Sequence, residues 1–227
     1  MLSTFLVPIH RAGWPFVGLL ALVTVGLGLW IESLGWAGAV FTVWCAYFFR
    51  DPDRVTPVGE TLVVSPADGT IRAIDLASPP PELEMAATVC YRVSIFMNVF
   101  NVHVNRIPCD GTVKRLAYRP GKFLNASFDK TSEINERQGI CLAMKNGAEI
   151  GLVQIAGVIA KRIVCELVQG QPVRAGQRFG MIRFGSRVDL YLPEGLHPLV
   201  AVGQRTIAGE TVIADFNIPQ GRTGESR

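Results

Sequence analysis

Hydrophobic and polar positions divide this chain into two unlike parts. Residues 12–31 contain no charged side chain, and neither do residues 33–49, with Glu32 alone between them. The first stretch has about the 20 residues that a helix needs to cross a bilayer, and the second is at the short end of that range. The pattern predicts two apolar helices joined by a tight turn, forming a membrane-associating hairpin over residues 1–50.

Charges and aromatic rings around the two stretches support this interpretation. Arg11 precedes the pair, and Arg50 and Arg54 follow it. Because basic residues flank the cytoplasmic ends of membrane helices, both ends of the hairpin are predicted on the cytoplasmic side. The rings expected at a membrane interface are Trp14, Trp30, Trp36, Trp44 and Tyr47. A cleaved signal peptide fits poorly because a second apolar stretch follows the first. A buried core hairpin remains an alternative, and the depth in the bilayer stays open.

The pattern changes at about residue 55. Short runs rich in Val, Ile, Thr and Phe now alternate with Gly, Pro and Asp turns, which is typical of a mostly β domain. The runs are Thr61–Val64, Thr70–Ile74, Val89–Met97, Val99–Val104, Thr112–Ala117, Ile150–Ile159 and Val188–Leu192. Residues 120–137 lack periodicity and are predicted to form a long loop. We therefore expect residues 51–227 to form a β-sandwich of the barrel-sandwich kind.

Charge and cysteine content exclude several classes of protein. The net charge is only +3, and no basic run interleaved with aromatic residues suggests a nucleic-acid partner. The small excess suits either an anionic membrane surface or ordinary solvation. The five cysteines include no C-x-x-C pair, so neither a zinc site nor a disulfide framework is indicated, and a reducing compartment is inferred. The three histidines are too scattered to predict a metal site.

The candidate chemistry lies at the Gly185–Ser186 bond. Chance alone gives about one Gly-Ser pair in a chain of this composition, so the neighbours must decide its meaning. If residues 182–192 are extended, Ser186 is the only polar member of an apolar face. Its hydroxyl could attack the Gly185 carbonyl and convert the peptide bond to an ester. Elimination and hydrolysis would then leave a pyruvoyl group on the new N-terminus. A small buried serine bonded to a nearby carbonyl is the alternative.

A serine nucleophile needs a base, and the base is usually oriented by a third group. His103 lies between two valines in a predicted strand and is nearly the only imidazole available to the β domain. His10 precedes the apolar segment, and His197 lies in a Gly/Pro loop. Asp68, in a Pro-Ala-Asp-Gly turn, is the candidate third group. A structural histidine and an ordinary turn aspartate are the corresponding alternatives.

Taken in order, these motifs resemble the phosphatidylserine decarboxylase proenzymes of the short bacterial or archaeal type. The resemblance covers about residues 47–193. The motifs are Phe48–Pro52, Ser65–Gly69, Asn101–Pro108, Pro120–Phe123, Asn135–Arg137 and Phe184–Ser186.

The resemblance implies cleavage between Gly185 and Ser186 into a β chain of residues 1–185 and an α chain of residues 186–227. It implies a covalent pyruvoyl cofactor made from Ser186, no metal, and catalytic roles for Ser186, His103 and Asp68. The ketone would form a Schiff base with the amine of phosphatidylserine, giving phosphatidylethanolamine and CO2. Long members carry a second histidine where this chain has Arg106, so His103 is assigned processing, decarboxylation or both.

The implied location is the cytoplasmic face of the cell (inner) membrane, with the α and β chains as a heterodimer and further self-association left open. Arg119, Lys122 and Arg137 are candidate phosphate partners, or equally solvated charges. One competing hypothesis is a membrane-anchored barrel-sandwich adaptor or carrier without catalysis. Lys161, its candidate carrier lysine, lacks the expected Met or Asp before it. Another is a pyruvoyl enzyme acting on a soluble amino acid.

Overall fold

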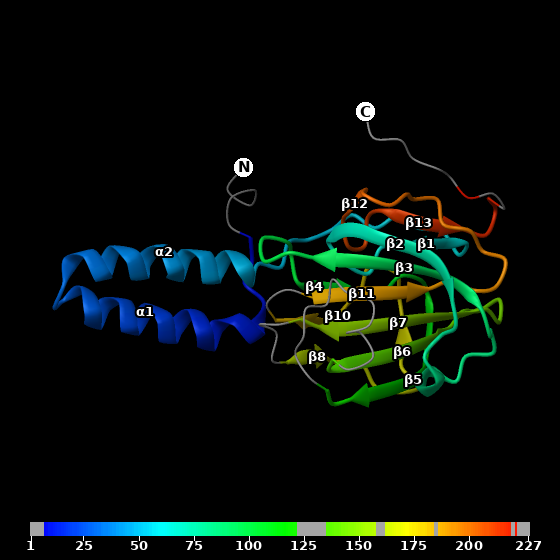
Figure 1. Cartoon of the computed structure of the whole chain (residues 1–227), viewed down its shortest axis with the longest axis horizontal. Helices are drawn as coiled ribbons and strands as arrows, with labels where there is room; N and C mark the ends of the chain where they lie inside the picture. Colours follow the sequence, from blue (N-terminus) through cyan, green and yellow to red (C-terminus); the bar gives the residue numbers. More distant parts are fainter. Residues whose placement is uncertain (1–6, 122–134, 158–161, 184–185, 219–220, 222–227) are drawn as a thin grey trace. The chain divides into compact units, whose positions relative to one another are not determined.

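The computed structural model describes residues 7–121, 135–157, 162–183, 186–218 and 221 (Figure 1). The chain forms two compact units, Met1–Asp53 and Arg54–Arg227, and each is considered by itself.

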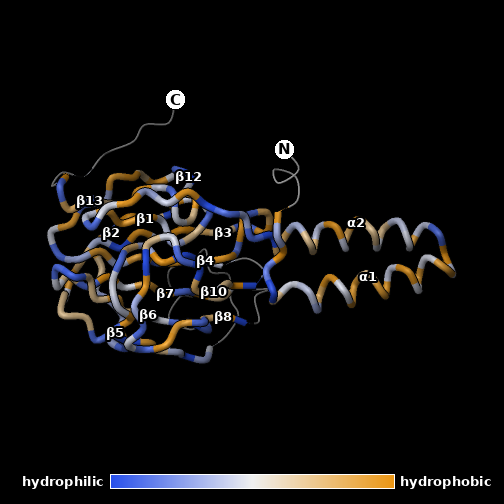
Figure 2. Tube along the Cα trace, turned by 180° about the vertical axis from the view of Figure 1, so that it is seen from behind, coloured by the Kyte–Doolittle hydropathy of each residue, from blue (hydrophilic) through white to orange (hydrophobic). Residues whose placement is uncertain are grey.

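The first unit is a helical hairpin whose apolar side chains are largely exposed. It contains a short 3-10 turn, η2 (Arg11–Gly13), and the helices α1 (Trp14–Gly28) and α2 (Glu32–Phe48). No residue of α1 is buried, and only Cys45 and Phe48 are buried in α2. Apolar residues lie on all sides of α1, which is not expected of a surface helix in water. Hydrophobic residues recur along the whole length of both helices (Figure 2). Among the described residues, Arg11–Gly28 is the one stretch whose length and composition suit a membrane crossing.

The two helices meet along a seam of small and hydroxyl-bearing residues. A Cβ atom on Gly35 would lie 2.8 Å from the Cα of Gly28, so the backbones touch there. The Oγ1 atoms of Thr24 and Thr42 lie 3.1 Å apart. Each also lies 2.8 Å from a backbone carbonyl of its own helix, so one hydroxyl donates across the seam while the other donates to its helix. Close backbone approach and interhelical hydrogen bonds are the means by which helices associate in lipid, where burial of apolar surface supplies no driving force.

The second unit is an antiparallel β domain. Its strands are β1 (Leu62–Val64), β2 (Gly69–Ala77), β3 (Cys90–Met97), β4 (Val104–Arg106), β5 (Gly111–Arg119), β6 (Arg137–Ala143), β7 (Glu149–Ala156), β8 (Ile163–Cys165), β9 (Pro172–Val173), β10 (Arg178–Ile182), β11 (Ser186–Tyr191), β12 (Arg205–Thr206) and β13 (Val212–Asp215), with a 3-10 turn η3 (Pro81–Leu83) after β2. The main sheet has the order β12-β2-β3-β11-β7-β6-β5-β9, and two small sheets have the orders β4-β10-β8 and β1-β13. The predicted fold class, mostly β with an N-terminal helical hairpin, is confirmed.

The core lies on the inner face of the main sheet, where side chains from all three sheets pack together. Val188 and Leu190 of β11 meet Phe179 and Ile182 of the β10 region and Ile213 of β13. Strand β11 is central, since all six of its residues pair with β3 on one side and with β7 on the other (Figure 1). Its alternation therefore places one set of side chains in this core and the other on the outer face.

The structure differs from two local expectations, an extended stretch 182–192 and a strand at Val99–Val104, and it contains one strand that was not predicted. No continuous strand covers residues 182–192, because Ile182 ends β10 in a small sheet and Ser186 begins β11 in the main one. Val99–Val104 is not a strand either. Asn98 and Asn101 side chains accept backbone N–H groups in a turn there, and β4 begins only at Val104. Strand β6 was not predicted, because its first three residues are Arg137, Gln138 and Gly139 and only the last four are apolar.

We predict that Gly35→Val weakens the hairpin, because its side chain would have to enter the space that the Gly28 backbone occupies. Overpacking of this kind costs about 1–3 kcal/mol. All four tryptophans of the chain lie in the hairpin, so tryptophan fluorescence during heating in detergent micelles reports on this unit. The unfolding midpoint should fall for Gly35→Val. It should stay unchanged for Gly26→Val, since no atom lies within 4 Å of a Cβ at Gly26. Equal unfolding midpoints for the two variants would contradict the close packing of the two helices at Gly28 and Gly35.

Candidate active site

Ser186 is the first residue of β11 and is completely buried. Its cross-strand neighbours are Met97 of β3 and Ala156 of β7. The predicted alternation holds from Ser186 onward, since Val188 and Leu190 lie in the core on the same face. Its Oγ atom is buried without a hydrogen-bond partner. Buried hydroxyls are almost always bonded, so this atom needs a functional explanation. Phe184 and Gly185 lie outside the described residues.

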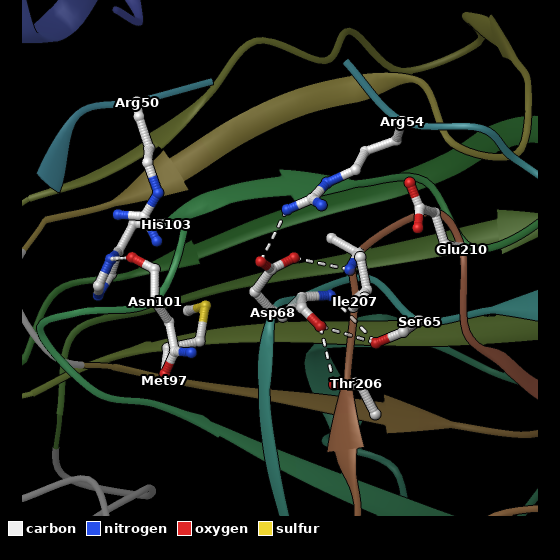
Figure 3. Close-up of polar contacts among 12 residues, drawn as sticks. Arg50, Arg54, Ser65, Asp68, Met97, Asn101, His103, Thr206, Ile207 and Glu210 are labelled. Carbon is white, nitrogen blue, oxygen red and sulfur yellow. Dashed lines mark hydrogen bonds and ion pairs between the residues drawn. The ribbon is translucent and has the colours of Figure 1, made fainter. Parts of the chain in front are cut away.

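His103 immediately precedes β4 and is also completely buried. The backbone carbonyl oxygen of His103 accepts a hydrogen bond of 3.3 Å from the N–H of Ile182. This bond holds His103 beside Ile182, the last residue of β10, which precedes Ser186 by four residues. The ring Nδ1 lies 2.9 Å from the carbonyl oxygen of Asn101 (Figure 3). A carbonyl oxygen only accepts, so Nδ1 must carry the proton, and the neutral ring then has its lone pair on Nε2. His103 is thus prepared to accept a proton at Nε2.

The other two histidines have structural contacts. His10 accepts the backbone N–H of Ala12 at the start of η2, and the ring of His197 lies 5.0 Å from that of Tyr91. These contacts favour His103 as the base among the three.

Asp68 lies at the tip of the turn that leads into β2. Its Oδ2 accepts a hydrogen bond of 2.8 Å from Arg54, and its Oδ1 accepts one of 2.8 Å from the backbone N–H of Ala208 (Figure 3). Thr206 Oγ1 donates to the Ala67 carbonyl oxygen in the same turn. These two contacts hold the Asp68 carboxylate in place, and the Asn101 carbonyl oxygen orients the ring of His103.

The start of β2 lies against β3 at the end where Ser186 pairs. A Cβ at Gly69 would lie 2.4 Å from the Phe96 carbonyl oxygen, so only glycine permits this approach. Phe96 and Met97 in turn pair with Arg187 and Ser186. Two strand spacings therefore separate the backbones near Asp68 and Ser186, which is about 10 Å.

Sequence reasoning missed a network of buried amides around these residues. Gln154 Nε2 donates to Asn105 Oδ1 at 2.8 Å, and Asn105 Nδ2 lies 3.4 Å from the Pro66 carbonyl oxygen and 3.6 Å from Met97 Sδ. Asn135 Nδ2 donates to the Ala156 carbonyl oxygen at 2.8 Å. The network joins the Asp68 turn, β4 and β7. Asn105 and Asn135 belong to motifs on which the family resemblance rests, so the sequence could have identified them. Gln154 belongs to none of those motifs and differs from its neighbours only in being polar within an apolar run.

The other candidate cations differ in their surroundings. Arg106, at the position of the second family histidine, donates to the Gly176 carbonyl oxygen at 2.9 Å. Arg137 forms an ion pair with Glu82 of η3, and Arg119 is exposed at the end of β5. Lys122 and Lys161 lie outside the described residues.

Burial raises the pKa of Cys109 to about 12 and the pKa of Cys90 and of Cys141 to about 11, so these thiols stay protonated at neutral pH. Within the described ranges, no three His, Cys, Asp or Glu side chains are grouped so that they could hold a metal ion.

Comparison with known proteins agrees with the family resemblance of the sequence motifs. The family model described as phosphatidylserine decarboxylase matches residues 41–214. A phosphatidylserine decarboxylase proenzyme of Paramagnetospirillum magneticum is 58% identical over 221 residues, which cover 97% of this chain and 92% of the relative. The proenzyme of Cereibacter sphaeroides is 55% identical over 98% of this chain and 96% of its own length. That of Ruegeria pomeroyi is 56% identical over 95% of this chain and 99% of its own length.

We predict that the neutral ring of His103 carries its proton on Nδ1, because the Asn101 carbonyl oxygen leaves no alternative there. Long-range proton–nitrogen NMR spectra of the Ser186→Ala chain, labelled at histidine, distinguish the two tautomers. The His103→Gln variant identifies which of the three signals belongs to His103. A proton on Nε2 of that ring would contradict the proposed base.

Proposed function

The chain belongs to the phosphatidylserine decarboxylase family, whose members are carboxy-lyases, and we propose that it converts phosphatidylserine to phosphatidylethanolamine and CO2. We further propose that it first cuts its own backbone between Gly185 and Ser186, and that Ser186 becomes a pyruvoyl group. The observation that carries this proposal is the Ser186 hydroxyl, which is completely buried and has no hydrogen-bond partner.

The self-cleavage needs a base and a fixed nucleophile. In the proposal, His103 Nε2 takes the proton of the Ser186 hydroxyl while Oγ attacks the Gly185 carbonyl carbon, and the peptide bond becomes an ester. Loss of the Ser186 α-proton then expels the Gly185 carboxylate. Tautomerisation and addition of water release ammonia and leave a ketone at position 186. Asp68 would supply a fixed negative charge that favours the protonated imidazole.

The residues around Ser186 fit such a group. Its place at the first position of a strand makes it a new chain end after the cut, while the rest of β11 stays paired with β3 and β7. When formed, the ketone supplies an electron sink for decarboxylation by condensing with the substrate amine. We also assign His103 the role of acid. It would hold the proton that the substrate carbon gains after CO2 has left.

The exposed apolar hairpin supports a location at a membrane, where a two-tailed substrate resides. Both ends of the hairpin carry arginine, which supports the cytoplasmic face of the cell membrane. The same location offers the anionic surface that suits the small positive charge. The non-catalytic adaptor hypothesis gains no comparable support, because the matched family is one of decarboxylases.

We predict that purified protein consists of two polypeptides, residues 1–185 and residues 186–227, and that Ser186→Ala is uncut and inactive. Intact mass spectrometry of the smaller piece should show a ketone in place of the N-terminal amine, and borohydride should add two hydrogens to it. Active material that contains only the full-length chain with an ordinary serine would end the proposal.

Variants of the proposed base make this test more specific. His103→Gln should slow the cut by about 100-fold or more, in the usual range for loss of a general base. The matched control is His197→Gln, since His197 lies in a loop and its ring packs against that of Tyr91. Equal cutting by the two variants would move the base elsewhere.

We also predict that CO2 release requires the lipid. Phosphatidylserine in detergent micelles should be decarboxylated, whereas free serine at the same concentration should give no more than about 1% of that rate, since binding energy from the remote acyl part is lost. Equal rates would instead favour the soluble amino-acid decarboxylase hypothesis.

A further inference from the structure

Five buried polar side-chain atoms of the described residues have no hydrogen-bond partner, and three of them are oxygens near the start of β11. These are Ser186 Oγ, Gln154 Oε1 and Glu136 Oε2; the other two are Arg137 Nε and Arg183 Nε. Ser186 is accounted for by the proposed cut, whereas Glu136 and Gln154 have no role in it. Unsatisfied buried groups are few in folded proteins and usually mark a ligand, a water or a reaction.

Strand register puts the three on one face. Ser186 pairs with Ala156, and the Ala156 N–H donates to the Glu136 carbonyl oxygen, so the three residues form one row across β11, β7 and the start of β6. Gln154 precedes Ala156 by two residues. Residues opposite each other, or two apart on one strand, share a face. Because Ala156 and Val188 belong to the core, this is the inner face.

The separations suit one small ligand. Glu136 is two strands from Ser186, about 10 Å between backbones, and the reach of its side chain shortens the gap. Gln154 is a diagonal neighbour of Ser186 at about 7–8 Å. A group bound between the two side chains would therefore be next to position 186.

No cation among the residues that the structure describes pairs with the Glu136 carboxylate. Glu136 is 4% exposed. Its Oε1 accepts from Tyr118 Oη at 3.1 Å and lies 3.5 Å from the Ile163 N–H, both neutral donors. None of the ion pairs among the described residues includes Glu136. Arg162 lies near, since its charge opposes the rise in the pKa of Tyr118, but it is exposed and forms no ion pair there. An ionised carboxylate out of water without a cation is costly, so a cationic ligand would relieve that cost.

Gln154 presents a second acceptor rather than a donor. Its Nε2 donates a hydrogen bond to Asn105 Oδ1, so the amide oxygen Oε1 points in a different direction from that bond. An ammonium group donates three hydrogen bonds and accepts none, so it matches a carboxylate oxygen and an amide oxygen together.

We propose that Glu136 and Gln154 form the subsite that receives the ammonium group of the serine headgroup beside position 186. This inference rests on the proposed function and adds to it the residues that select an amine. It gives a role to two buried acceptor atoms of the inner face that have no hydrogen-bond partner. Glu136 is then a substrate-binding residue that brings the amine to the reacting position.

The experiment uses the full-length Ser186→Ala chain, which retains the subsite without needing the cut. It is titrated calorimetrically with O-phospho-L-serine and with L-3-phosphoglycerate, two probes that differ only by an ammonium group or a hydroxyl at C2. Phosphoserine should bind about 10- to 100-fold more tightly, the usual range for a hydrogen bond to a charged group. Glu136→Gln in the same background should bring the ratio of affinities close to one.

The matched control is Glu149→Gln, the same substitution at the other end of β7. Glu149 bonds Lys114 and the Ala86 N–H, and it lies about 23 Å along the strand from Ala156. This variant should keep the preference for phosphoserine. Should Glu136→Gln fail to fold, Gln154→Met is titrated instead, and its ratio should fall several-fold.

A second readout separates this inference from the proposed function. With Ser186 intact, Glu136→Gln should cut itself normally, while its KM for phosphatidylserine rises about 10-fold or more. An unchanged KM, or an unchanged ratio of affinities in the titration, would overturn the ammonium subsite and leave the decarboxylase assignment standing. Absence of the cut in the unsubstituted chain would instead remove the proposed function, whatever the titration gives.

Discussion

The site depends on one constraint, the pairing of β11 on both sides. Every residue from Ser186 to Tyr191 has a partner in β3 and another in β7. Val188 and Leu190 are completely buried on the inner face. On the outer face, Arg187 forms a buried ion pair with Asp189 and donates to Ser94 Oγ at 2.9 Å. A slip of one residue would exchange these two faces and put the ion pair in the apolar core. The position of Ser186 is therefore fixed by the whole strand rather than by its own contacts.

This constraint bears directly on a chain that would cut itself. The bond before Ser186 lies at the edge of the ladder, so breaking it removes none of the pairs of β11. In the proposed α chain, β11 would remain between β3 and β7, β12 beside β2, and β13 beside β1. The same interactions that position the nucleophile would then keep the two products together.

Polar groups are used sparingly inside the β domain, and they concentrate at one end of the main sheet. Asn105 and Gln154 bond each other, His103 bonds the Asn101 carbonyl oxygen, and Asp68 is held by Arg54. Outside this end the inner face is almost wholly aliphatic. Buried polar groups destabilise a core unless they are bonded, so this concentration is expected where chemistry requires it. The hairpin follows different physics, since its glycine and threonine seam needs no apolar burial and leaves its hydrophobic surface available to lipid.

The sequence by itself determined the coarse architecture and singled out the residues that we propose for the reaction. Uncharged stretches of helical length and runs with turn signals are local features, so they predicted the hairpin, the mostly β domain and the burial of Ser186 on an apolar face. The tertiary structure decided what depends on distant segments. The pairing of Ser186 with Ala156 and the alignment of Glu136 and Gln154 with it follow from strand register. Register is settled by packing across the whole sheet, because each strand alone is compatible with several pairings. For the same reason the chain changes sheets between Ile182 and Ser186, where a single strand was the simpler local expectation.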